Sequence, residues 1–97
     1  MPKAYWISCL RKIYDADKVA AYSKLAAPAI AAAGGKIIAR ANPALVYENG
    51  VKERTVIIEF EDVAAAQACH DSASYQAALK AFEGGVDRDL RIVEAVD

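Results

Sequence analysis

Two side chains in this sequence of 97 residues could carry acid–base chemistry, and they lie in different segments. Glu59 interrupts the apolar run Ile57 to Phe60, where a carboxylate needs a cation or several hydrogen-bond donors, or else takes up a proton. Histidine titrates nearest to neutrality, and His70 is the only one in the chain. Either residue could act as a general base if it faced a pocket. The competing interpretations are a structural ion pair of Glu59 with Arg40 or Arg54, and a surface or helix-capping histidine.

Aromatic residues with a polar tip recur along the chain and could line a cavity for a small apolar or aromatic molecule. The alternative is that they simply fill a hydrophobic core. The candidate ligand-binding residues are Tyr5, Trp6, Tyr22, Arg40 and Tyr75, and Tyr47 is a further aromatic that could take part.

The sequence offers no recognisable metal-binding motif. Cys9 and Cys69 stand alone, and with His70 they would give three ligands, one fewer than a tetrahedral zinc site needs. We therefore expect no metal and no cofactor, and we expect two reduced core thiols in a cytoplasmic protein.

Pro2 opens a remote alternative. After removal of Met1, its secondary amine could act as a base at the start of the first strand, as in the N-terminal-proline tautomerases. The second half of the chain does not follow the tautomerase pattern.

Composition excludes several classes of protein. The chain is 56% hydrophobic and 26% charged, with a net charge of -1, which is typical of a folded globular domain. Lys and Arg are scattered instead of forming a basic face, so we expect no nucleic-acid partner. No apolar run approaches the roughly 20 residues of a membrane span, so we expect no membrane partner.

Hydrophobic periodicity and breaker residues predict one domain over residues 1–97, with six main elements. The expected strands cover residues 4–10, 36–41, 54–60 and 90–96, with 44–47 extending the second strand. One expected helix begins after the cap Asp15 and ends at Gly34-Gly35. The other begins after the cap Asp62, continues to about residue 70 and restarts at Ser74.

This β-α-β-β-α-β order is that of the ferredoxin-like fold, an α+β sandwich with a four-stranded antiparallel sheet and both helices on one face. The opposite face would still carry apolar side chains, those of Tyr5, Ile7, Cys9 and Ile57. A second copy of the same face is the simplest cover, so we expect a homodimer.

Several stretches together resemble a known bacterial family. They are Ala4-Tyr5-Trp6-Ile7, Ala27-Pro28, Gly34-Gly35-Lys36, Arg54 to Phe60, Ser72 to Ala78 and Ile92-Val93-Glu94. The chain is similar over nearly its whole length to the domain of unknown function 1330 family, in the dimeric α+β barrel superfamily. The resemblance implies the fold and the dimer. The wider group includes cofactor-independent monooxygenases, lactone isomerases, haem-degrading enzymes and stress proteins, and fold alone does not choose among them.

Three functional hypotheses follow. The first is a ligand-binding or stress-linked module that holds a small molecule between sheet and helices. The second is a cofactor-independent enzyme of the monooxygenase or isomerase kind, using Glu59, His70 and a tyrosine. The third is a purely structural dimer whose cavity is filled by side chains.

Overall fold

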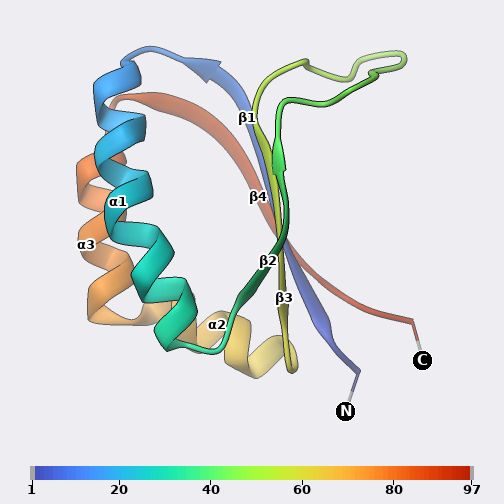
Figure 1. Cartoon of the computed structure of the whole chain (residues 1–97), viewed down its shortest axis with the longest axis vertical. Coiled ribbons are helices and arrows are strands. Elements are labelled where there is room, and N and C mark those ends of the chain that lie inside the picture. The colour runs from blue at the N-terminus through green and yellow to red at the C-terminus, as the bar shows by residue number, and fades with distance from the viewer. Residues whose placement is uncertain (1, 97) are drawn as a thin grey trace.

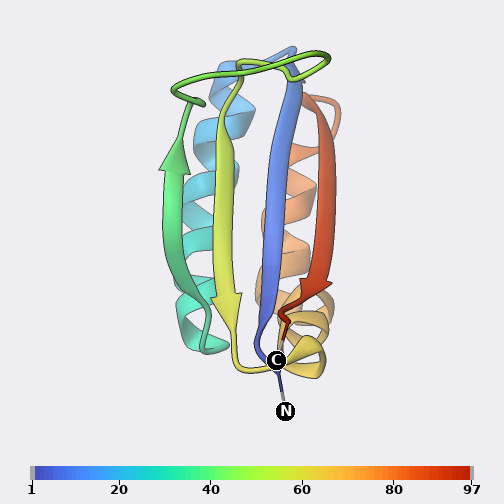
Figure 2. The same cartoon turned by 90° about the vertical axis from the view of Figure 1, so that its right-hand side faces the viewer.

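A computed structural model describes residues 2–96, which form two layers (Figures 1 and 2). The elements are, in chain order, β1 (Ala4–Ile13), α1 (Ala16–Ala32), β2 (Lys36–Ala41), β3 (Thr55–Phe60), α2 (Val63–Asp71), α3 (Ala73–Phe82) and β4 (Val86–Glu94). The strands form one antiparallel sheet in the order β2-β3-β1-β4, and the helices lie on one of its faces. This confirms the predicted ferredoxin-like α+β arrangement, with one helix more than expected.

The central strand β1 sorts its side chains strictly by parity. Its even-numbered residues from Ala4 to Leu10 are buried toward the helices, whereas the odd-numbered residues from Tyr5 to Cys9 face the opposite way and are half-buried. Trp6 lies in register with Ile58 of β3 and Ile92 of β4, so the centre of the core crosses three strands. The face toward the helices is called the inner face below, and the other the outer face.

Helix α1 begins and ends where the sequence predicts. The Asp15 carboxylate accepts hydrogen bonds from the backbone N–H groups of Asp17 and Lys18, at 3.0 and 3.4 Å, and so caps the first turn. At the other end Gly34 has φ +86°, which favours glycine. A Cβ on Gly35 would lie 2.6 Å from Ile30 Cγ2, so the chain can pass the core here only without a side chain.

The second helical region is divided in two at Ser72. The Asp62 carboxylate accepts from Ala65 N–H at 2.8 Å and caps α2, as predicted. Ser72 ends α2 and its Oγ accepts from Tyr75 N–H at 3.2 Å, so the same residue caps α3. The predicted restart at Ser74 is therefore one residue late, because Ser72 supplies the capping hydroxyl and α3 begins at Ala73.

Strand β4 begins at Val86, directly after the glycine pair, and not at Leu90 as expected. It pairs with an extended β1 as far as the partners Ile13 and Val86. The charged side chains of residues 87–89 obscured this part of the strand in the sequence. Because β4 begins at Val86, Arg88 lies within the sheet.

Residues 42–54 form an arm and not the strand extension expected at 44–47. Pairing between β2 and β3 ends at Ala41 and Thr55, and the chain beyond projects past the sheet, away from the helices (Figure 1). A tight turn at its tip is closed by Gly50 N–H donating to the Tyr47 carbonyl at 2.9 Å, and Glu48 has φ 53°. The Tyr47 side chain is 76% exposed.

Both edges of the sheet are irregular or charged. In β2 the register shifts between Ile37 and Ala39, which leaves Ile38 as an extra residue. At the other edge β4 carries Asp87, Arg88, Asp89 and Arg91.

Replacing Asp62 by Ala should lower the free energy of unfolding by about 1 kcal/mol, because the Ala65 N–H loses its side-chain acceptor. Urea unfolding followed by circular dichroism measures this. The matched control, Asp62→Asn, keeps a capping oxygen and should stay within about 0.5 kcal/mol of the native chain. Equal losses in the two variants would show that the charge, and not the cap, matters.

Candidate functional site

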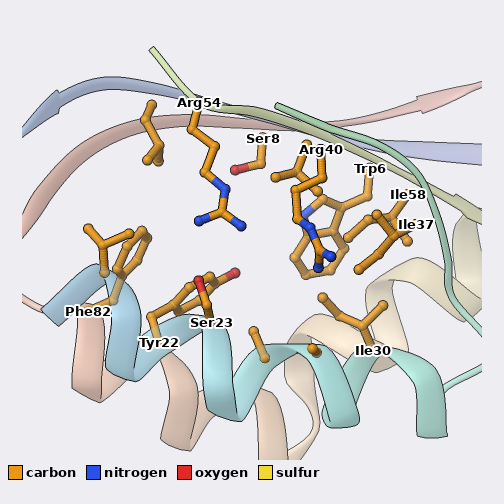
Figure 3. Close-up of a pocket in the computed structure, with 15 residues that line it drawn as sticks. Trp6, Ser8, Tyr22, Ser23, Ile30, Ile37, Arg40, Arg54, Ile58 and Phe82 are labelled. Carbon is orange, nitrogen blue, oxygen red and sulfur yellow. The ribbon is translucent and has the colours of Figure 1, made fainter. Parts of the chain in front are cut away.

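A cavity lies on the inner face, between α1 and strands β1, β2 and β3 (Figure 3). Its volume is about 60 Å³. Its apolar wall includes Trp6, Leu10, Val19, Ile30, Ile37, Val56, Ile58 and Phe82. Its polar side chains are those of Ser8, Tyr22, Ser23, Arg40 and Arg54, and no acidic residue is among its described lining. An apolar space with a few convergent polar groups is typical of small-molecule sites.

The two arginines reach the cavity from neighbouring strands. Arg40 of β2 is in register with Val56 of β3, an inner-face position, and Arg54 shares the parity of Val56. Arg40 is exposed and Arg54 half-buried, so they mark the mouth of the cavity, above Tyr22 and Ser23 of α1 in Figure 3. Within residues 2–96 neither guanidinium has a carboxylate partner or a side-chain hydrogen bond.

Beside the cavity, two phenols and one guanidinium form a closed cluster. The hydroxyl oxygens of Tyr22 and Tyr75 lie 2.7 Å apart. Arg88 donates from Nη1 to Tyr22 at 3.0 Å and from Nη2 to Tyr75 at 3.1 Å. The cluster joins α1, α3 and β4, and it is packed by aromatic rings: Tyr22 stacks on Phe82 at 4.0 Å, and Trp6 meets Tyr75 edge-on at 4.9 Å.

Burial decides the charge states in this cluster. Tyr75 is 0% exposed, and loss of hydration raises its pKa well above the ordinary tyrosine value, although the nearby Arg88 acts in the opposite direction. Arginine stays protonated in proteins. At neutral pH the Arg88 cation therefore lies against a neutral Tyr75 phenol.

Sequence reasoning named Tyr22 and Tyr75 but missed Arg88, because the residue was expected to lie before the last strand. The available signal for a longer strand was the row of charged residues at the odd positions Asp87, Asp89 and Arg91, with apolar residues at the even positions Leu90 and Ile92.

Glu59 lies on the outer face, away from the cavity. Its carboxylate is 3.4 Å from the Lys3 ammonium and its side chain is 25% exposed. The expected ion pair with Arg40 or Arg54 is wrong, because both arginines have inner-face parity and Glu59 has the opposite one. The ion pair with Lys3 is partly solvated and is worth little stability.

His70 lies at the end of α2 and does not line the cavity. Its ring centre is 6.1 Å from that of Trp6 and 5.5 Å from that of Tyr75, so one side of the imidazole covers the aromatic core. Its Nδ1 is 3.0 Å from a carboxylate oxygen of Asp71. The structure does not bring His70 and Glu59 together at one site.

The other named residues divide between the two faces. Trp6, Tyr22 and Arg40 line the cavity, and the Tyr75 hydroxyl is hydrogen-bonded to that of Tyr22. Tyr5 is on the outer face and Tyr47 is in the arm, so neither reaches the cavity. Cys69 is a buried free thiol as expected, whereas Cys9 is a free, half-buried thiol of the outer face and not part of the core.

Metal-binding clusters and membrane-spanning helices are both absent from residues 2–96. No group of three or more His, Cys, Asp or Glu side chains in that range is placed to hold a metal ion. Nor does any helix there combine the length and hydropathy needed to cross a bilayer.

Comparison with known proteins gives a family and a fold. Residues 3–96 match the family model described as a domain of unknown function, DUF1330. No curated protein sequence matches the chain.

Among solved structures, a protein of unknown function from Rhodopseudomonas palustris is similar with a TM-score of 0.76 and 19% identity, over 99% of this chain and 84% of that one. SnoaB, a cofactor-independent oxygenase from Streptomyces nogalater, has a TM-score of 0.70 and 10% identity, over 100% and 96%. A dimeric, ferredoxin-like protein of unknown function from Bacteroides fragilis has a TM-score of 0.61 and 14% identity, over 96% of each chain. Likenesses at these identities show a shared fold.

Replacing Tyr75 by Phe should lower the free energy of unfolding at pH 7 by about 1–3 kcal/mol, because Arg88 and Tyr22 each lose a buried hydrogen-bond partner. The pKa of Tyr75 is higher in the folded than in the unfolded chain. Its contribution is therefore complete below about pH 10 and declines as the pH rises further. Urea unfolding at pH 7, 9 and 10.5 should show the native chain losing stability faster than the variant. The control Tyr14→Phe, at an exposed tyrosine, should change stability at pH 7 by less than about 0.5 kcal/mol.

Proposed function

This chain belongs to the DUF1330 family, and we propose that it is a homodimeric binding protein for a small apolar or aromatic molecule, held between α1 and the sheet. The observation that carries the proposal is the cavity itself. Its wall is apolar, its mouth is polar, and the side chains at the mouth have no partners among residues 2–96. A site that served only as core would be closed by packing.

The size of the cavity limits the ligand. Its 60 Å³ is far below the roughly 300–1,000 Å³ of sites for drug-sized molecules. Arg40 and Arg54 are long side chains at the mouth without ion pairs in residues 2–96, so they can move aside at little cost. Only a molecule of at most one ring suits a space of this size, with its apolar part inside and its polar part beside the arginines.

The outer face supports self-association. Its half-buried residues Tyr5, Ile7, Cys9 and Ile57 are continuous with Ile38 and Val93, which are 49% and 46% exposed. The arm projects on the same side of the sheet and carries the exposed Leu45, Val46, Tyr47 and Val51 (Figure 1). A matching face on a second copy would cover both sets, and a protein similar in fold is described as dimeric.

An enzymatic function is the second candidate, because the fold is shared with a cofactor-independent oxygenase. It needs a base beside the ligand. Glu59 and His70 lie outside the cavity, and Pro2 is not among its lining residues either, so monooxygenase, isomerase and tautomerase chemistry all lack that group here. Binding, which needs no base, cofactor or metal, is the better-supported function. The binding experiment in the next paragraph distinguishes a binding protein from a purely structural or stress-linked dimer. The two free thiols favour a reducing compartment, and we propose the cytoplasm.

Filling the cavity should abolish binding. Ala27 of α1 lines it, and Ala27→Phe would place a ring in the space that the ligand needs. Trp6 is the only tryptophan and lies in the cavity wall, so its fluorescence reports binding of probes such as benzoate and benzamide. We expect at least a tenfold loss of affinity, on the order of 1.4 kcal/mol, for either probe that the native chain binds.

The matched control is Ala20→Phe, on an exposed position of the same helix, which should bind as the native chain does. If neither probe alters Trp6 fluorescence in the native chain, the structural dimer becomes the better interpretation.

Placing a charge on the outer face should disrupt the proposed dimer. Ile57→Lys puts an ammonium opposite Ile7 in the middle of that face, and an unpaired charge buried at an interface costs several kcal/mol. Static light scattering at micromolar concentration should show a dimer for the native chain and a monomer or insoluble material for the variant. Leu25→Lys, on an exposed part of α1, should remain dimeric. A native chain with the mass of a monomer would refute the dimer.

A further inference from the structure

The hydroxyl protons of the Tyr22, Tyr75 and Arg88 cluster can be assigned from its geometry. Both phenol oxygens accept from Arg88, and the single contact between them uses one hydroxyl proton. Tyr75 is 0% exposed and has no other acceptor among residues 2–96. All groups are satisfied only if Tyr75 donates to Tyr22, since a buried hydroxyl without an acceptor is costly.

The second proton, that of Tyr22, is then free. Tyr22 lines the cavity, and in Figure 3 its oxygen points into the space between α1 and the strands. Its oxygen already accepts from Tyr75 and from the Arg88 cation, so its remaining role is to donate. Hydrogen bonds from a donor polarised in this way are stronger than those from an isolated phenol.

A second, independent observation is the hydroxyl of Ser8. Ser8 is 6% exposed and lines the cavity, yet its side chain makes no hydrogen bond within residues 2–96. The described residues contain no occluded side-chain oxygen or nitrogen without a partner, so this hydroxyl keeps a surface toward the cavity. In Figure 3 it lies beside Arg54, on the side of the cavity opposite Tyr22. A buried, unpartnered hydroxyl aimed into a cavity indicates a polar ligand atom.

The charges around the cavity all have one sign. Arg40 and Arg54 are at its mouth, Arg88 lies directly behind Tyr22, and no carboxylate is among its described lining. In a partly dehydrated site such a set favours an anion, because the interaction is screened less than at the surface. The planar guanidinium fork matches the two oxygens of a carboxylate.

We propose that the ligand is a small aromatic or apolar carboxylate, whose carboxylate is held by the Arg54 guanidinium and the Tyr22 hydroxyl while its apolar body lies against Trp6. This inference rests on the proposed binding function and names its substrate class. Arg40, which is more exposed, closes the mouth over the bound acid, and Ser8 offers a further hydrogen bond. The size of the cavity limits the class to acids of at most one ring.

Two probes of the same shape test the charge directly: benzoate, an anion at pH 7, and its neutral amide, benzamide. Trp6 fluorescence titrations of the full chain should give at least about tenfold tighter binding of the acid, the effect of one charge-assisted hydrogen bond. Arg54→Gln should remove that preference by weakening the acid about tenfold while changing the amide less than about twofold. Tyr22→Phe should weaken the acid several-fold in the same selective way.

The matched control is Lys24→Gln, which removes one positive charge from an exposed position of α1 and should leave both affinities unchanged. Equal binding of acid and amide by the native chain would overturn the carboxylate inference and leave the binding function standing. Binding of neither probe would overturn both. If Lys24→Gln also lost the preference for the acid over the amide, the net charge of the protein would explain the attraction of the acid, and a specific site at Arg54 would be refuted. If Arg54→Gln does not fold, Arg54→Lys is the substitute variant, because it keeps the positive charge but lacks the planar guanidinium. It should lower the preference for the acid over the amide at least threefold. An unchanged preference would overturn the role of Arg54.

Discussion

The structure depends on one constraint: β1, one of the two central strands, has to supply apolar side chains to two different surroundings. Successive residues of a strand point to opposite faces, so Trp6 can be core only if Tyr5 and Ile7 are not. The helices cover the inner face alone, as Figure 2 shows. The alternation along β1 therefore separates the proposed interface on the outer face from the core and the cavity, which share the inner face. A side chain can be changed on one face without contact with the other.

The cluster of Tyr22, Tyr75 and Arg88 is the polar counterpart of that hydrophobic arrangement. It fixes α1, α3 and β4 to one another through three hydrogen bonds of 2.7–3.1 Å, in a region where apolar packing alone would specify positions less sharply. The same bonds orient the Tyr22 hydroxyl toward the cavity. A structural role and the proposed ligand-binding role are thus combined in Tyr22. The half-buried Arg88 cation is tolerated beside the aromatic rings because it donates to both phenol oxygens.

The sequence was sufficient for the elements whose signals are local. Asp15 and Asp62 were recognised as caps from residue type alone, and the glycine pairs marked the helix ends. The sequence was insufficient for the elements whose length depends on pairing with a distant strand. Arg88 was missed because β4 is long only through its pairing with the extended end of β1, and residues 44–47 favour a strand locally but find no partner. The pairing of the strands alone places Glu59 on the face opposite to that of Arg40 and Arg54. The ion pair of Glu59 with Lys3 depends in addition on where the chain lies at the start of β1, which the sequence does not give.

The edges of the sheet have a consequence for how large an assembly can become. A bare, regular edge strand is a template on which further copies can add by backbone hydrogen bonding, as in fibrils. Here β2 interrupts its own ladder with the bulge at Ile38, and β4 presents a row of charges. Growth by strand addition is disfavoured at both ends, while the outer face remains free to associate. The fold therefore disfavours open-ended polymerisation by strand addition, even though the outer face and the arm expose apolar side chains.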